Sequence, residues 1–258
     1  MKKAFSLVEM LVVVGIIAVL VGFTIPAINA LQKSYDSTGA DSMISAALAT
    51  ARTLAISNHN YAGVRFQKAW KSTDDPNKAD QYMIFIIYTE PKKMGNLTDA
   101  FRAIEGYKPV KLPANIGVMD MKLGCSSDAA INLDSLINEA KELIDTTSFS
   151  IVFSPAGKLV ICDVQTRNKD GKNYNDNSST DNVFNIAANV NNDTALFIQD
   201  DPESNTPDGL DKEKSRNKFV IYDRQRFNTI ATSQRYSRYL KDLQYVFVNP
   251  YTGQLIEK

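Results

Sequence analysis

A long apolar segment dominates the start of the chain, from Phe5 to Ile28. The residues that interrupt it are Ser6, Glu9, Thr24 and Pro26. As a helix this segment would extend about 36 Å, which is enough to cross a bilayer core of about 30 Å. Lys2 and Lys3 precede it, and positive flanking residues stay on the cytoplasmic side. The pattern predicts a single-pass inner-membrane protein with a cytoplasmic N-terminus and a periplasmic or otherwise extracytoplasmic remainder.

Apolar residues continue at helical spacing beyond this segment. They are Ile28, Leu31, Tyr35, Ile44, Leu48, Ala51 and Ala55. Such spacing is typical of an amphipathic helix. We therefore expect one helix over residues 5–58, in which residues 5–28 span the membrane and residues 29–58 pack on the rest of the protein.

The remainder, residues 59–258, alternates between strand-like and polar segments. Residues 61–66, 81–89, 148–153, 159–164, 219–222 and 243–248 are rich in β-branched and aromatic residues and predict strands. Apolar stripes predict short helices over residues 133–144 and 233–243. Residues 168–213 are polar and predict a surface insertion that is partly disordered. The expected fold is α+β, with a long N-terminal helix packed on an antiparallel β-sheet domain.

Composition limits the functional classes. The chain has 29 basic and 29 acidic residues, so the whole molecule has no net charge with which to attract nucleic acid. It lacks the HExxH, GxSxG, GxxxxGK[ST] and GxGxxG patterns of common hydrolases and nucleotide-binding proteins. We expect no enzymatic activity and no cofactor.

The first twenty residues carry a specific motif. Residues 2–20 read Lys-Lys-Ala-Phe-Ser-Leu-Val-Glu-Met and continue into Val, Leu and Ile. This segment resembles the cleavage and methylation motif of type IV prepilins and type II secretion pseudopilins. The resemblance implies that prepilin peptidase cuts between Ala4 and Phe5, and that Phe5 is then N-methylated. The family usually has glycine where Ala4 stands, and alanine is the smallest alternative.

Glu9 is a carboxylate within the apolar segment, where a charge is costly. It could extend to the lipid headgroups. The resemblance implies a second role, in which Glu9 of one subunit neutralises the Phe5 α-amine of its neighbour in a fibre. The implied partners are other pilin-like subunits bound through the N-terminal helix, prepilin peptidase and an inner-membrane assembly platform.

Weaker similarity concerns the subtype. Residues 46–57 with the following Val64-Arg65-Phe66, and residues 153–159, are similar to segments of H-type minor pseudopilins. We therefore expect a minor pseudopilin that supports protein export by type II secretion. The alternatives are a minor pilin of a type IV pilus that binds DNA for uptake, and an anchored enzyme or carbohydrate-binding domain.

Residues 168–176 hold oxygen-bearing side chains around a glycine, as calcium loops do. The candidate ligands are Asp170, Asn173 and Asp176. Calcium needs six to eight converging oxygens, and the distal glutamate of an EF-hand is missing. A solvated loop is therefore the favoured interpretation.

The two cysteines, Cys125 and Cys162, could form a disulfide in an oxidising compartment or stay as buried thiols. The sequence leaves both alternatives open.

Residues 214–241 contain eight basic residues and the single acidic residue Asp223, with tyrosines between them. Arg235, Arg238 and Lys241 are candidates for phosphate contacts. The favoured alternative is that these charges pair with the acidic insertion just before them, so nucleic acid is not an expected partner.

Overall fold

The computed structural model describes residues 10–11, 13–15, 39–69, 71, 74–89, 100–124, 127–170, 172, 176–201 and 211–257. The chain divides into two compact units, Met1–Gly39 and Ala40–Lys258. In the first unit the described residues are helical. The second unit contains the sheets.

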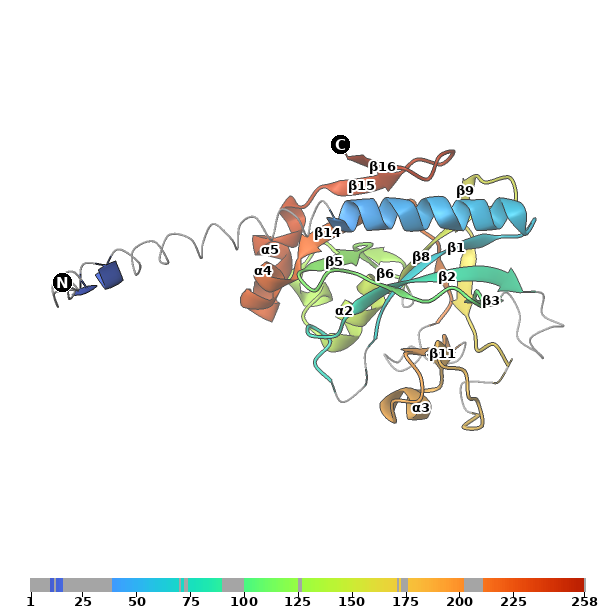
Figure 1. Cartoon of the computed structure of the whole chain (residues 1–258), viewed down its shortest axis with the longest axis horizontal. Coiled ribbons are helices and arrows are strands. Elements are labelled where there is room, and N and C mark those ends of the chain that lie inside the picture. The colour runs from blue at the N-terminus through green and yellow to red at the C-terminus, as the bar shows by residue number, and fades with distance from the viewer. Residues whose placement is uncertain are drawn as a thin grey trace, which may run out of the picture. The chain divides into compact units, whose positions relative to one another are not determined.

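From Ala40 onward, the helix over residues 39–57 lies in the second unit (Figure 1). Its buried face consists of Ile44, Ala47, Leu48, Ala51, Leu54 and Ala55. These positions recur every three or four residues, so they form one stripe, which packs against the sheet. The helix ends before His59, which has a positive φ of 48°. Such a conformation does not continue a right-handed helix.

The expected fold class is wrong in two respects. The described helix has 19 residues rather than extending over residues 5–58. The main sheet is mixed rather than antiparallel, because a long crossover brings two of its strands together in the same direction. The protein is mostly sheet, with short helices beside it.

The expected single-pass inner-membrane location is also corrected. Within the part of the chain that the structure describes, no helix combines the length and the apolar character that crossing a bilayer requires. The helix over residues 39–57 carries Asp41, Thr50 and Arg52 among its apolar positions. The segment predicted to span, residues 5–28, lies outside the described residues except for residues 10–11 and 13–15.

The main sheet has eight strands in the order β13-β10-β3-β2-β1-β8-β9, with β4 paired to β2. β3 and β10 are parallel, and the other neighbours are antiparallel. The strands are β1 (Ala62–Lys68), β2 (Gln81–Thr89), β3 (Ala100–Ala103), β4 (Val110–Lys111), β8 (Phe149–Phe153), β9 (Leu159–Val160), β10 (Asp163–Thr166) and β13 (Glu213–Lys214).

This sheet curls until its two sides approach each other. β13 pairs with β10 at one edge. Directly after β13, the backbone N–H of Ser215 donates to the Cys162 carbonyl (2.8 Å), and the backbone N–H of Arg216 donates to the Ser150 carbonyl on β8 (2.7 Å). The residues after β13 therefore connect the β10 side of the sheet to the β8 side, and the concave face becomes an interior.

Alternate residues of β1 face different surroundings, because successive side chains in a strand point to opposite faces. Val64 and Phe66 join the core under the helix, where Phe66 stacks on Phe149 with ring centroids 4.8 Å apart. Arg65 and Gln67 point to the concave interior, and both are buried. β1 is thus buried on both faces.

A second, antiparallel sheet has the order β16-β15-β14-β5. Its strands are β5 (Ile116–Met119), β14 (Lys218–Asp223), β15 (Tyr245–Val248) and β16 (Leu255–Glu257). Short helices pack around Tyr222 and Phe227 on one side of it. They are η2 (Asp134–Leu136), α2 (Ala140–Thr147), α4 (Arg224–Thr229), η3 (Thr232–Gln234), α5 (Arg235–Arg238) and η4 (Leu240–Asp242). A two-stranded ribbon pairs β6 (Lys122–Leu123) with β7 (Ala129–Ala130).

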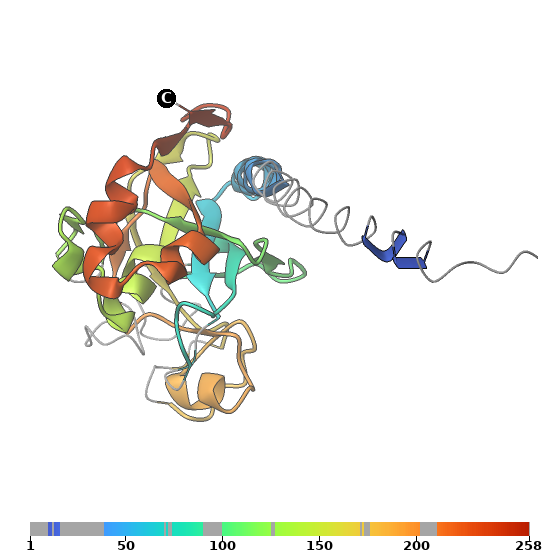
Figure 2. The ribbon, with the colours of Figure 1, turned by 90° about the vertical axis from the view of Figure 1, so that its left-hand side faces the viewer.

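The described part of the polar insertion forms regular elements and packs on the sheet. It contains β11 (Phe184–Asn185), α3 (Ala187–Asn191) and β12 (Phe197–Ile198), and the two strands are parallel. Phe184 and Phe197 are buried against the main sheet, and Phe197 meets the ring of Tyr82 edge-on. The segment around α3 lies at the side of the sheet away from the helix of residues 39–57 (Figures 1 and 2).

Candidate functional site

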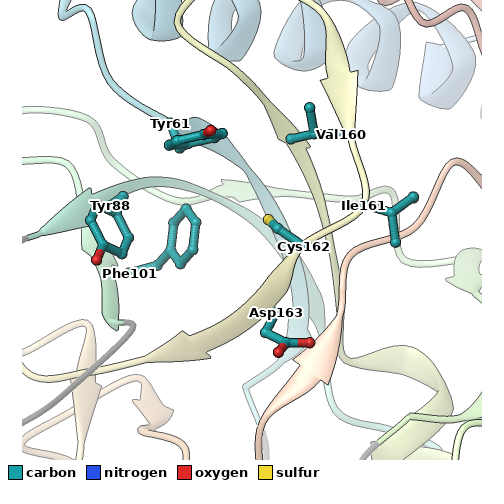
Figure 3. Close-up of a pocket in the computed structure, with 7 residues that line it drawn as sticks. All are labelled: Tyr61, Tyr88, Phe101, Val160, Ile161, Cys162 and Asp163. Atoms are coloured by element: carbon teal, nitrogen blue, oxygen red, sulfur yellow. The ribbon is translucent and has the colours of Figure 1, made fainter.

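A pocket of about 570 Å³ lies beside the connection between β9 and β10. Tyr61 precedes β1, Tyr88 lies on β2 and Phe101 lies on β3. The opposite wall comes from residues 160–163, in which Cys162 points toward the rings of Tyr61 and Phe101 (Figure 3). The pocket has the size of a small-ligand site.

Backbone contacts position the aromatic wall. The Asn60 side-chain amide donates to the Tyr88 carbonyl (2.9 Å), and the Tyr88 N–H donates to the Tyr61 carbonyl (2.9 Å). Tyr88 meets Tyr61 and Phe101 edge-on, with ring centroids 6.5 and 5.6 Å apart. Edge-to-face contacts are favoured because the positive ring edge meets the negative ring face.

Cys162 has a free thiol that is partly buried. Burial raises the pKa of this thiol, the Asp163 carboxylate raises it further, and a hydrogen bond from the Ser215 hydroxyl (3.8 Å to Sγ) lowers it. The thiol is therefore protonated at neutral pH, and the thiolate is the nucleophilic form. This chemistry suits an apolar binding surface rather than a nucleophile. Cys125, the other candidate for a disulfide, lies outside the described residues.

A second cluster lies inside the curled sheet and consists of charged side chains. Arg65 donates from Nη1 to Glu213 Oε1 (2.9 Å) and from Nη2 to Asp200 Oδ1 (2.9 Å). All three side chains are 0% exposed. Arg65 also donates from Nε to Gln67 Oε1 (3.0 Å), and Ser150 Oγ donates to Glu213 Oε1 (3.1 Å). One buried cation thus holds two buried carboxylates.

The cluster continues toward the second sheet. Arg216 donates from Nε to Asp120 (2.5 Å), and its Nη1 lies 2.7 Å from Asp128. Burial raises the pKa of Asp120 to about 7, despite the opposing effect of Arg216. A Cβ on Gly124 would lie 3.0 Å from Arg216 Nη2, so glycine leaves room for this guanidinium.

No local sequence motif indicates this cluster of buried charges. Its charged residues are too far apart in the chain to form a local motif: they are Arg65, Asp120, Asp200, Glu213 and Arg216. The alternation along β1 predicts that Arg65 and Phe66 point to opposite faces of the sheet. It does not show whether the face of Arg65 is exposed to solvent or closed off inside the protein. The one sequence signal for the cluster is Arg65 itself, the single charged residue in the apolar strand predicted over residues 61–66.

The basic stretch of residues 214–241 is partly turned inward. Arg235 is buried, donates to the Asn77 side chain (2.9 Å) and stacks on Phe227. Arg224 is buried and donates to the carbonyls of Asn77 (2.9 Å) and Ala79 (2.7 Å).

Of the three candidate phosphate contacts, Arg238 and Lys241 are exposed. The remaining one, Arg235, is the buried residue described above. The structure therefore does not place the three on one accessible surface.

The calcium candidates do not converge on a ligand set. Among the described residues, no group of three or more carboxylate, histidine or cysteine side chains could hold a metal ion. Asp170 accepts from the Lys172 backbone (3.0 Å), and Asp176 accepts from Ser178 and lies 3.6 Å from the Lys172 ammonium. Asn173 lies outside the described residues.

The processing and assembly residues of the N-terminal motif, Ala4, Phe5 and Glu9, also lie outside the described residues. Their roles remain expectations from the sequence. The comparisons add no assignment. No family model, curated protein or solved structure matches this chain.

Proposed function

We propose that this chain is a non-enzymatic, pilin-like structural subunit that is cleaved between Ala4 and Phe5 and joins a pilus or pseudopilus fibre through its N-terminal segment. The observation that carries the proposal is the motif of residues 2–20. The globular part departs from the fold that the resemblance implies, so it adds no weight to the assignment.

Exposed apolar side chains support assembly through this segment. Met10, Leu11 and Val14 are 62%, 67% and 62% exposed. Successive exposed apolar residues on a helical segment are typical of an interface with another chain. In a fibre, each subunit would cover this surface on its neighbour.

The proposed system is protein export by a type II secretion pseudopilus, in which the chain is a minor subunit. Uptake of DNA by a type IV pilus is less favoured, because Arg235 is engaged inside the domain. An exposed pair such as Arg238 and Lys241 would give only a weak attraction to phosphates, with a log-log salt slope of about −2 at most.

Co-expression of the chain with a prepilin peptidase tests the first step. We expect the intact mass of the mature protein to lack residues 1–4 and to include one methyl group on Phe5. An Ala4→Leu variant should stay uncut, since a bulky residue replaces the small one before the cleaved bond. A Lys3→Arg variant is the matched control and should be cut normally. A wild-type chain that keeps Met1 beside an active peptidase would contradict the proposal.

Assembly is tested separately from processing. We expect a Glu9→Ala variant to be cleaved normally and to lose cross-links to other pilin-like subunits, because the Phe5 α-amine of a neighbour would have no counter-charge. Glu105→Ala, at an exposed position in the globular part, is the control and should keep these cross-links. Equal cross-linking of the Glu9 variant and wild type would reject this mode of assembly.

A further inference from the structure

Inside the curled sheet, one guanidinium faces two carboxylates. Arg65 on β1 contacts Asp200, which follows β12, and Glu213 in β13, and none of the three is exposed. A buried carboxylate is stable as an anion only when a cation or several hydrogen bonds compensate it. Arg167 also acts on Asp200 and Arg216 on Glu213, but Arg216 is already paired with Asp120 and Asp128. The carboxylates therefore outnumber the guanidinium groups, and the cluster favours one additional proton.

Hydrogen bonding indicates which carboxyl group holds this proton. Asp200 accepts at both oxygens, from Arg65 at Oδ1 (2.9 Å) and from the Thr166 backbone N–H at Oδ2 (2.6 Å). Glu213 accepts from Arg65 and Ser150 at Oε1. Its Oε2 is buried, and within the described part of the chain it has no hydrogen-bond partner. A proton on Oε2 disturbs none of the bonds that hold the cluster.

Oε2 also borders a small space lined by a donor and an acceptor. A Cβ built on Gly124 would lie 3.0 Å from Arg216 Nη2, 3.5 Å from Glu213 Oε2 and 3.6 Å from Asp145 Oδ1. A protonated carboxyl is a hydrogen-bond donor, whereas an ionised one is only an acceptor. Protonation therefore gives Glu213 a donor at the space that the Asp145 acceptor also borders.

The charges around Glu213 come from several elements. Arg65 on β1 and Arg216 after β13 lower its pKa, whereas Asp200 after β12 and Asp120 after β5 raise it. Asp145 on α2 faces the same space. Burial has the largest effect, and the result is a pKa raised from 4.5 to about 8.

We propose that Arg65, Asp200 and Glu213 form a pH-sensitive clasp, in which a proton on Glu213 Oε2 holds β13 and the residues after β12 on the interior face of the curled sheet. Above neutral pH the proton leaves, an uncompensated carboxylate remains inside the sheet, and the clasp loosens. Asp200 and Glu213 lie on either side of residues 201–212, so the clasp fixes both ends of this stretch.

The sign of the pH effect follows from proton linkage. Between pH 4.5 and about 8, Glu213 is protonated in the folded chain and ionised in the unfolded chain. Unfolding then releases a proton, and the unfolding equilibrium constant rises by up to tenfold per pH unit. The stabilisation is fully present below pH 4.5 and is lost as the pH rises through about 8. Most paired carboxyl groups give the opposite dependence.

Urea unfolding of the full chain at pH 6, 7 and 8 provides the test, with Glu213→Gln as the main variant. Glutamine is neutral at every pH and has the shape of the protonated side chain. We expect the unfolding equilibrium constant of wild type to rise with pH. In the variant, this rise should be smaller by a factor of up to ten per pH unit. Glu105→Gln, at an exposed ion pair, is the matched control and should keep the wild-type slope.

Asp200→Asn is a second variant in case Glu213→Gln does not fold. It removes one of the two carboxyl groups that share the Arg65 guanidinium, so Glu213 should be ionised and its contribution to the slope should again be lost. The hydrogen-exchange rate of peptides from residues 197–201 and 211–216 should increase with pH more steeply in wild type than in either variant. A slope that is unchanged in a folded Glu213→Gln or Asp200→Asn protein would overturn the proposal.

Discussion

Replacing Arg65 with methionine is the most direct test of how the interior of the sheet is stabilised. Methionine keeps much of the side-chain length, but it removes the charge and the hydrogen bonds to Glu213, Asp200 and Gln67. The Asp200 carboxylate then remains inside the sheet without the Arg65 counter-charge, beside a Glu213 that is protonated at pH 7. Removing one partner of a buried ion pair typically costs about 3 to 5 kcal/mol. We expect Arg65→Met to lower the free energy of unfolding by at least about 3 kcal/mol at pH 7.

A neutral version of the cluster separates charge from packing. When Asp200→Asn and Glu213→Gln accompany Arg65→Met, no uncompensated charge remains, so most of the loss should be recovered. Lys122→Met is the matched control, since Lys122 pairs with Asp128 at 2.7 Å but both side chains are partly exposed, 32% and 39%. It should cost about 0 to 1 kcal/mol.

Urea unfolding followed by circular dichroism measures all these variants. If Arg65→Met lowered the free energy of unfolding as little as the Lys122→Met control, the proposed role of the buried charges would be refuted. A triple variant that is less stable than Arg65→Met alone would refute it as well. In either case the charges of the cluster would not be the dominant contribution, and packing would have to explain the burial.

Three further predictions concern the sheet core and the pocket. Phe66→Ala should lower the free energy of unfolding by about 3 to 5 kcal/mol in urea titrations, because Phe66 is fully buried and stacks on Phe149; a loss below about 1 kcal/mol would contradict its place in the core. Gly63→Ala should lower the melting temperature, since its Cβ would overlap the Ile151 carbonyl oxygen on the adjacent strand; an unchanged melting temperature would show that the two strands can separate locally. Cys162 should react with iodoacetamide more slowly than glutathione does at pH 7.5, because its raised pKa leaves little thiolate; equal rates would contradict its protonated state.

Much of the strand content could be predicted from the sequence. Residues 81–89 were predicted as a strand and form β2 with the same bounds, because Met, Ile, Phe and Tyr dominate this run. Residues 148–153 and 219–222 lie within one or two residues of β8 and β14. β-Branched and aromatic content gives a strong local signal in strands that are buried on both faces.

Strand partners could not be predicted in the same way. Residues 159–164 were expected to form one strand, but Ile161 and Cys162 divide it into β9 and β10. β9 pairs with β8, whereas β10 pairs with β3 and β13. Composition reports on whether a segment is extended, not on which strand lies beside it.

The interior cluster escaped prediction for a related reason. Arg65 reads as a solvent-facing residue of a two-sided strand, and Asp200 lies in a stretch whose acidic composition is typical of a solvated loop. Both become interior residues because the insertion folds onto the concave side of the sheet. The charge pattern of an isolated segment does not contain this information.

The long separation between Arg65 and its partners also constrains when the domain can form during synthesis. Arg65 contacts Asp200 and Glu213, which are 135 and 148 positions further along the chain. Its strand also needs β8, which begins at Phe149. A nascent chain that has emerged only as far as β2 has the β1–β2 hairpin, but it lacks both the second neighbour of β1 and the counter-charges for Arg65. Vectorial folding from the N-terminus is therefore blocked at the centre of this sheet, and the domain completes only when nearly the whole polypeptide has left the ribosome.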